Sequence, residues 1–202
     1  MMLITSLTSP YGRKTRMAAV ILGLSSRVAV VHGDTRDPND PLRIHNPLGK
    51  IPILIPEGGS PIYDSHVILE YFDHLAGGDA IIPADPARRF AELTRAKLAD
   101  GIIDASLLVT YEGRYREASQ KSEVWLTHQR DKLWRALDAI SAELPGWEPP
   151  RVSGITLACA LSYMDWRKPV DWRTKHPALV HWLEGFAAAV PAYGETAHPA
   201  DS

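Results

Sequence analysis

The chain has 202 residues, of which 45% are hydrophobic and 23% are charged, and its formal net charge at pH 7 is −2. This length suits one large or two small domains, and this composition allows a sizeable buried core. Because the net charge is close to zero, nothing in it attracts a polyanion, and we expect no nucleic-acid partner.

The absence of long apolar runs and the low cysteine content indicate the cellular compartment in which the protein is expected. No apolar run approaches the roughly 18 residues that a membrane helix needs, and residues 1–7 lack the charged start of a signal peptide. A single cysteine, Cys159, excludes an intrachain disulfide. We therefore expect a cytoplasmic protein with no membrane partner.

The first part of the chain alternates strand and helix patterns. In chain order we predict a strand over 2–6, a helix over 11–24, a strand over 27–31, a polar loop over 33–47 with at most one helical turn, a β-hairpin of 52–55 and 60–63, and a helix from 65 to 75. The predicted order is βαβ, loop, ββα.

The second part shows helical periodicity only. We predict helices over 87–111, 120–144, 156–166 and 178–189. Glycines and prolines concentrate between the two parts, over residues 77–86. The predicted fold class is therefore an α/β domain followed by an all-α bundle.

The most informative motif is Asn46-Pro47-Leu48-Gly49-Lys50-Ile51-Pro52, followed by Asp64-Ser65 at the start of a predicted helix. Pro52 has no N–H and is suited to the first position of a strand, which leaves the main chain at Ile51 free to pair with something else. Ser65 begins a helix whose N-terminal N–H groups can bind a carboxylate. Alone, each feature is an ordinary strand entry or helix cap. Their joint spacing favours a small-molecule site with an anion pocket.

This combination resembles the glutathione-binding half of the cytosolic glutathione S-transferases, which use a thioredoxin-like domain. The resemblance implies a cis peptide bond before Pro52 and a main chain at Ile51 that pairs with the cysteinyl part of glutathione. It also implies that Asp64 and Ser65 hold the charged γ-glutamyl end, and that Lys50 reaches the glycyl carboxylate.

The resemblance covers nearly the whole chain and implies its domains: a thioredoxin-like glutathione-binding domain over 1–77, a linker over 78–86 and an all-α domain over 87–202. It also implies a homodimer. The segment Thr156-Leu157-Ala158-Cys159 falls where the family places a Ser/Thr-x-x-Asp capping box, with cysteine in place of the acid. We expect Thr156 to cap the helix without the reciprocal bond.

The loop before the first helix carries the expected catalytic group. Glutathione transfer needs a thiolate, and a thiol with its ordinary pKa of about 8.5 is mostly protonated at neutral pH. Ser9 occupies the serine position of a Ser-Pro-x-x-Arg-Lys pattern common among bacterial members of the family, and we expect it to donate a hydrogen bond to the sulfur. Thr8 and Tyr11 are alternatives. Ser9 also has the position of a plain helix cap, with Pro10 as the first helical residue.

A second substrate would be small, electrophilic and partly apolar. Candidate binding residues are Tyr11, near Ser9, and Tyr111, Arg114 and Tyr115 at the end of the first long helix, since aromatic rings and guanidinium groups can stack on a flat molecule and pair with an anion. The alternative is a solvated helix terminus.

The predicted function is a glutathione S-transferase, with glutathione as co-substrate and a role in detoxification. Two alternatives stay open: a module of the same fold that binds glutathione or a protein without turnover, and a glutathione-dependent disulfide reductase. The eight histidines show no metal-site spacing, and no glycine-rich phosphate loop follows a strand. We therefore expect neither a metal nor a nucleotide.

Overall fold

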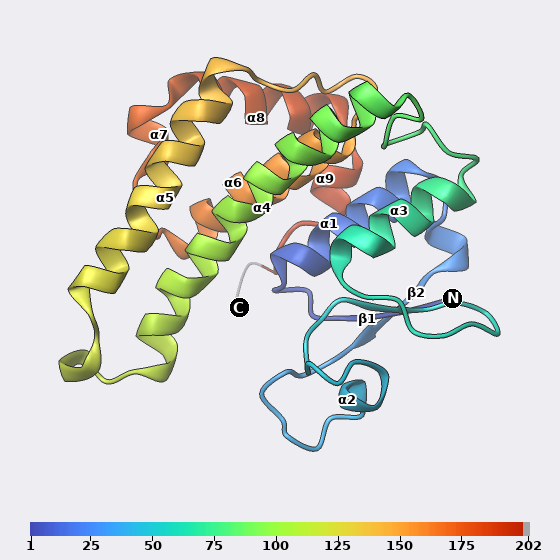
Figure 1. The fold of residues 1–202 in the computed structure, drawn as a ribbon, viewed down its shortest axis with the longest axis horizontal. Helices are drawn as coiled ribbons and strands as arrows, with labels where there is room; N and C mark the ends of the chain where they lie inside the picture. The colour runs from blue at the N-terminus through green and yellow to red at the C-terminus, as the bar shows by residue number, and fades with distance from the viewer. Residues whose placement is uncertain (200–202) are drawn as a thin grey trace. The chain divides into compact units, whose positions relative to one another are not determined.

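The computed structural model describes residues 1–199, which divide into two compact units (Figure 1). The N-terminal unit comprises residues 1–86 together with residues 190–199, and the helical unit comprises residues 87–189. The first contains a small sheet with helices, and the second is helical throughout. The predicted fold class is confirmed.

The N-terminal unit follows the predicted order closely. Its elements are β1 (Met2–Thr5), α1 (Pro10–Ile21), η1 (Ser25–Arg27), β2 (Ala29–His32), α2 (Leu42–His45), β3 (Ile53–Ile55), α3 (Ser65–Leu75) and α9 (Ala192–Glu195). The short α2 lies inside the predicted polar loop.

The sheet has three strands in the order β2-β1-β3. Strand β1 runs parallel to β2 and antiparallel to β3, so that Leu3 stands opposite both Val30 and Leu54. Figure 1 shows α1 and α3 side by side over one face of these strands, with α2 on the opposite side. Side chains of a strand alternate between the two faces, and Ile4 and Ile53 form a buried cluster with Leu42 of α2.

The predicted hairpin is wrong in its second strand, because 60–63 is reduced to a single antiparallel bridge between Ile62 and Leu54. Both main-chain groups of Ile62 bond to Leu54, with N···O distances of 2.9 and 2.8 Å. In this register the next hydrogen-bonded positions on the partner segment 52–56 are Pro52 and Pro56, and neither proline has an N–H to donate, which is the physical reason that the pairing stops at one bridge.

A buried carboxylate organises the connection after α3. Asp73 is 4% exposed, and its Oδ1 accepts hydrogen bonds from the main-chain N–H groups of Ala80, Ile81 and Ile82 at 3.0, 2.7 and 3.2 Å. Ile81 and Ile82 are buried as well. The segment after Gly78 is thus packed against the N-terminal unit.

The chain returns to the N-terminal unit after the helical unit. Helix α9 packs against α1, and the buried Arg13 donates to the carbonyl of Tyr193 at 2.9 Å while its guanidinium lies 4.6 Å from the centre of the Tyr193 ring. The domain bounds predicted from the sequence assign this segment to the helical domain. In the structure, residues 190–199 belong to the N-terminal unit.

The helical unit confirms the four predicted long helices and adds shorter ones. Its elements are α4 (Pro86–Tyr115), η2 (Ala118–Gln120), α5 (Glu123–Ala142), α6 (Val152–Arg167), α7 (Trp172–Lys175) and α8 (Pro177–Ala189). Over residues 1–199 no helix is long and apolar enough to cross a membrane.

The predicted cap of α6 is wrong. The helix begins at Val152, and the hydroxyl of Thr156 donates to the carbonyl of Val152 at 2.7 Å, which places Thr156 inside the first turns. The residue before the helix, Arg151, makes no side-chain capping bond. Instead, Glu92 of α4 accepts the N–H of Ser153. The helix gains its extra turn because this N–H finds an acceptor outside the sequence of α6.

Candidate functional site

Strand pairing brings the loop before α1 next to Pro52. The last paired residues of β1 and β3 are Ile4 and Ile53, and continuing that antiparallel register by one step places Thr5 opposite Pro52. The loop of residues 6–9 follows Thr5 directly. Two segments far apart in the sequence therefore meet at one end of the sheet.

The same register brings Asp64 to this end. Leu54 pairs with Ile62 in antiparallel orientation, so the chain after Ile62 runs toward the end of β3 that follows Pro52, and Asp64 comes two residues later. Ser65 follows as the first residue of α3. The structure thus gathers the three predicted site segments, around residues 9, 51 and 64, at the same end of the sheet.

Ser9 is the N-cap of α1. Its Oγ accepts a hydrogen bond from the N–H of Gly12 at 3.1 Å, and Pro10 is the first helical residue. The capping role foreseen as the alternative is therefore present. This bond uses an oxygen lone pair of the hydroxyl and leaves its proton for another acceptor, so capping and donation to a sulfur are compatible.

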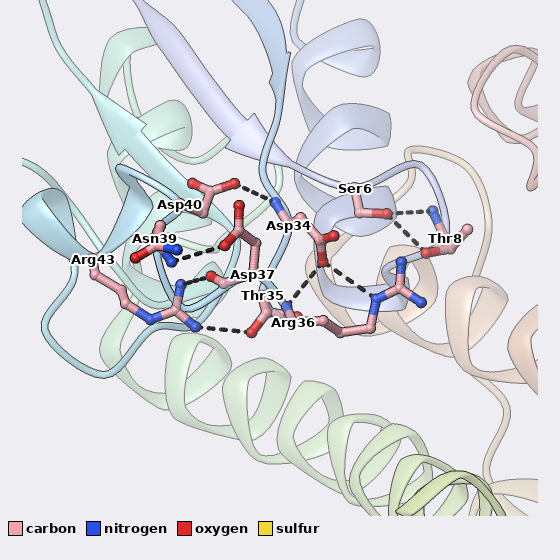
Figure 2. A network of polar contacts seen from close by, with 9 residues as sticks. All are labelled: Ser6, Thr8, Asp34, Thr35, Arg36, Asp37, Asn39, Asp40 and Arg43. Carbon is pink, nitrogen blue, oxygen red and sulfur yellow. Dashed lines mark hydrogen bonds and ion pairs between the residues drawn. The ribbon is translucent and has the colours of Figure 1, made fainter.

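Thr8 is paired with a hydroxyl that the sequence analysis missed. The oxygens of Ser6 and Thr8 lie 2.8 Å apart, and Ser6 Oγ also accepts from the N–H of Thr8 at 3.2 Å (Figure 2). Two hydroxyl residues only two positions apart in the sequence were the signal from which this pair could have been predicted. Of the other candidates here, Tyr11 is half-buried on α1, with the Lys14 ammonium 5.9 Å from its ring centre.

The Ile51–Pro52 peptide bond is cis, as the resemblance implied. Pro52 is buried, Ile51 is half-buried against the cluster of Ile4 and Ile53, and Lys50 is exposed. The Lys50 carbonyl accepts a hydrogen bond from the side chain of Asn46.

At the start of α3 the cap is Asp64. Its carboxylate accepts the N–H of His66 at 3.0 Å, whereas Ser65 is the first helical residue and is only 3% exposed. The two residues thus have different environments, an exposed carboxylate and a buried hydroxyl, at the N-terminus of an eleven-residue helix. The helix N-terminus favours an anion, and the exposed Asp64 carboxylate favours a cation.

The loop that follows β2 is held by carboxylates (Figure 2). Asp40 accepts the N–H groups of Leu42 and Asp34 at 2.8 and 2.7 Å, and these bonds lower the pKa of its carboxyl group. The pKa of Asp34 is lowered as well, chiefly by the hydrogen bond that it accepts from the N–H of Arg36. Both groups are therefore ionised at neutral pH.

The candidate second-substrate residues of the helical unit form an aromatic cluster. The rings of Tyr111 and Tyr115 meet edge to face with centres 5.2 Å apart, and the Arg114 guanidinium lies 5.3 Å from the Tyr111 ring centre. Burial, with a smaller contribution from Tyr115, raises the pKa of Tyr111. Tyr111 is half-buried and keeps its proton at neutral pH, whereas Tyr115 is 61% exposed.

No group of three or more His, Cys, Asp or Glu side chains in the described part of the chain, residues 1–199, is arranged to hold a metal ion. Cys159 is buried within α6.

Comparison with known proteins identifies related sequences and structures. A family model described as "Glutathione S-transferase, N-terminal domain" matches residues 8–75. The "Uncharacterized GST-like protein YibF" of Escherichia coli (strain K12) is 32% identical over 189 residues, which cover 91% of this chain and 92% of that protein.

Two solved structures extend the similarity to the fold. A glutathione transferase family member from Pseudomonas fluorescens Pf-5, crystallised with bound glutathione, is 40% identical with a TM-score of 0.90 and 98% coverage of both chains. A glutathione S-transferase from Methylobacillus flagellatus KT, also with glutathione bound, is 31% identical with a TM-score of 0.88, covering 98% of this chain and 99% of that one. With its thioredoxin-like N-terminal part and its helical second part, the chain belongs to the glutathione S-transferase family.

Proposed function

We propose that this protein is a glutathione transferase that joins the thiolate of glutathione to a small, electrophilic and partly apolar substrate. The gathering of three segments, around Ser9, Ile51 and Asp64, at one end of the sheet carries this proposal. Solved relatives with bound glutathione support the choice of ligand. Glutathione is then a co-substrate, and the reaction needs no metal and no nucleotide.

Each end of glutathione has a proposed binding group. The main chain of Ile51 pairs with the cysteinyl part, and Lys50 binds the glycyl carboxylate. The N-terminus of α3 and the Ser65 hydroxyl bind the α-carboxylate of the γ-glutamyl part, because helix N–H groups attract an anion. Asp64 binds its ammonium group, because a carboxylate attracts a cation.

Ser9 is the proposed activating residue. Its hydroxyl proton, not used in capping α1, donates to the glutathione sulfur and stabilises the thiolate. The positive end of α1 favours the same charge. Nucleophilic attack by the thiolate then forms the carbon–sulfur bond, and the electrophile either releases its leaving group or gains a proton after addition.

The second substrate is proposed to bind the cluster of Tyr111, Arg114 and Tyr115 in the helical unit, and Tyr11 is a separate candidate in the N-terminal unit. A flat apolar group would stack on the exposed Tyr115 ring, and an anionic group would pair with Arg114. We further propose, from family membership, a homodimer that works in the cytoplasm in detoxification. Analytical ultracentrifugation of the whole chain tests the dimer.

The proposed activity is tested by the ultraviolet absorbance of the glutathione thiolate, titrated with pH in the presence of saturating wild-type protein or its Ser9→Ala variant. We expect the thiol pKa to fall by about one unit or more from its usual value of about 8.5 in the wild type, and to return toward it in the variant. Thr8→Ala is the matched control and should leave the lowered pKa in place. An unshifted thiol pKa in the saturated wild type would contradict the enzymatic proposal.

One observation favours a second candidate function. Because Ser9 already serves as the cap of α1, the loop has a structural reason for its serine that needs no catalysis. A module that binds glutathione or a protein without turnover is therefore the alternative. Glutathione binding without a lowered thiol pKa, and without product from model electrophiles or disulfides, would identify it.

A further inference from the structure

Asn46 occupies a central position in the loop that leads to Ile51. It follows the last residue of α2, it is 2% exposed, and its N–H donates to the carbonyl of Leu42 at 2.8 Å. A buried amide side chain is costly unless its groups are hydrogen-bonded, so the partners of Asn46 show what its burial achieves.

The side-chain amide of Asn46 forms hydrogen bonds through both its oxygen and its nitrogen to the segment that follows. Its Oδ1 accepts the N–H of Leu48 at 3.0 Å, and its Nδ2 donates to the carbonyl of Lys50 at 2.9 Å. The main-chain carbonyl of Asn46 accepts the N–H of Gly49 at 2.9 Å. One side chain thus closes residues 46–50 into a turn, and only a group with both a donor and an acceptor can make both side-chain bonds.

The bond to Lys50 fixes a peptide plane. In a planar trans peptide the C=O and the next N–H point in opposite directions, and the Lys50–Ile51 bond is trans. Because the Lys50 carbonyl points to Asn46, the N–H of Ile51 points away from it. Within residues 1–199 this N–H has no hydrogen-bond acceptor. An N–H on a half-buried residue with no protein partner is suited to an acceptor on a ligand.

The side chain of Arg43 packs against the same turn. Its guanidinium donates to the carbonyls of Thr35 and Asp37, which ties α2 to the loop after β2 (Figure 2). Gly49 lies over the Arg43 side chain, since a Cβ at Gly49 would stand 3.4 Å from Arg43 Nε, and Gly49 has a positive φ of 62°. The turn therefore packs against a side chain that hydrogen bonds hold in place.

From this geometry we infer that Asn46 is a positioning residue, which orients the Lys50–Ile51 peptide so that the Ile51 N–H is presented to the carbonyl of the cysteinyl residue of glutathione. The inference rests on the proposed function and adds a residue that does not touch the ligand. A rotation of this peptide would withdraw the N–H of Ile51 and move the Lys50 side chain at the same time.

Two substitutions at Asn46 separate this role from others. Asn46→Asp keeps the shape of the side chain but cannot donate to the Lys50 carbonyl. Asn46→Ser keeps an acceptor for the Leu48 N–H in a smaller, uncharged side chain that does not reach Lys50. Asn39→Asp is the matched control, because Asn39 is exposed in the neighbouring loop and its change adds the same charge.

The measurement is the affinity for two ligands, glutathione and γ-glutamylcysteine, by calorimetry, with circular dichroism and the melting temperature as folding controls. We expect both Asn46 variants to bind both ligands about tenfold more weakly, the effect of a hydrogen bond lost at a binding site. Lys50→Met should weaken glutathione alone, because γ-glutamylcysteine lacks the glycyl carboxylate. Asn39→Asp should bind both ligands as the wild type does.

The pKa of the bound glutathione thiol distinguishes a change in the orientation of the Ile51 peptide from a disturbance of the whole binding site. In the Asn46 variants, saturated with glutathione, we expect the same thiol pKa as in the wild type, because Ser9 lies on a different loop. Folded Asn46 variants with wild-type affinity for both ligands would overturn the inference while leaving the proposed function intact. A wild type that binds neither ligand would overturn the proposed function, and the inference with it.

Discussion

Glu92 of α4 accepts a hydrogen bond from the main-chain N–H of Ser153 in the first turn of α6, with an O···N distance of 2.8 Å. The first N–H groups of a helix have no partner within the helix, and a negative charge there is favourable. Arg151, the residue at the N-cap, supplies no side-chain acceptor. A carboxylate from a distant part of the sequence thus does the work of a local cap.

Replacing Glu92 by alanine should destabilise the helical unit, because the buried N–H of Ser153 would lose its acceptor. We expect the free energy of unfolding to fall by about 1–3 kcal/mol. Glu92→Gln, which retains a neutral acceptor, should fall between the wild type and Glu92→Ala. The measurement is urea unfolding followed by circular dichroism. The exposed Glu184→Ala on α8 is the control, and an equal midpoint for Glu92→Ala and Glu184→Ala would contradict the assignment.

Gly12→Ala should strain the contact between α1 and β1. A Cβ at Gly12 would stand 1.9 Å from Thr5 Oγ1 and 3.0 Å from Thr5 Cβ, and overpacking of this kind costs about 1–3 kcal/mol. The double variant Thr5→Ala/Gly12→Ala should recover part of the loss, because it removes the nearer atom. Gly101→Ala on α4 is the control, since no atom lies within 4 Å of its added Cβ and alanine favours a helix. Thermal unfolding is measured for five proteins, the wild type, the two single variants, the double variant and Gly101→Ala, and additive effects of Thr5→Ala and Gly12→Ala would refute the contact.

Asp40→Asn should remove an acid-sensitive contribution to stability. The folded-state pKa of Asp40 lies below its usual value of about 3.9, so its contribution is present above that pH and is lost as the pH falls through the folded-state pKa. The wild type should therefore be more stable than the variant at pH 7, and the difference should shrink below about pH 4. Melting temperatures from pH 7 to pH 3 test this, with the exposed Asp131→Asn as control. A difference that is constant over this range would rule out the carboxylate as its source.

Tyr111 should titrate later than an ordinary tyrosine. Burial raises its pKa above the usual value of about 10, and since the charged form is disfavoured in the folded protein, stability should fall as the pH rises above 10. In a titration of absorbance near 295 nm, Tyr111→Phe should lose a step that lies above pH 10. Loss of a step at or below pH 10 in Tyr111→Phe would contradict the shift.

The secondary structure was predicted best where apolar periodicity extends over a whole helix or where a residue such as proline restricts the backbone. Helix α3 has the bounds expected from its apolar spacing behind Ser65, and the cis bond at Pro52 followed from the resemblance. The segments around Ile51 and Asp64 were recognised from their joint spacing, and Ser9 was recognised from the resemblance to the family. Their convergence at one end of the sheet depends on strand register, which no single segment encodes.

The features that could not be predicted depend on partners far away in the chain. The extra turn of α6 depends on Glu92, sixty-one residues before Ser153. The packing of residues 190–199 with the N-terminal unit depends on Arg13 and Tyr193, 180 residues apart. Asn46 was visible in the motif, but its two bonds to Leu48 and Lys50 appear only once the turn has formed.

The return of α9 to α1 has a consequence for the order in which the protein is made. During synthesis the sheet and α1 leave the ribosome before the helical unit, and the helical unit leaves before Tyr193 is available to Arg13. The N-terminal unit therefore completes its own packing last, although its sequence comes first. A nascent chain arrested before residue 190 would lack the Tyr193 acceptor of the buried Arg13, and the unit that binds glutathione in our proposal would be complete only after Tyr193 has been made.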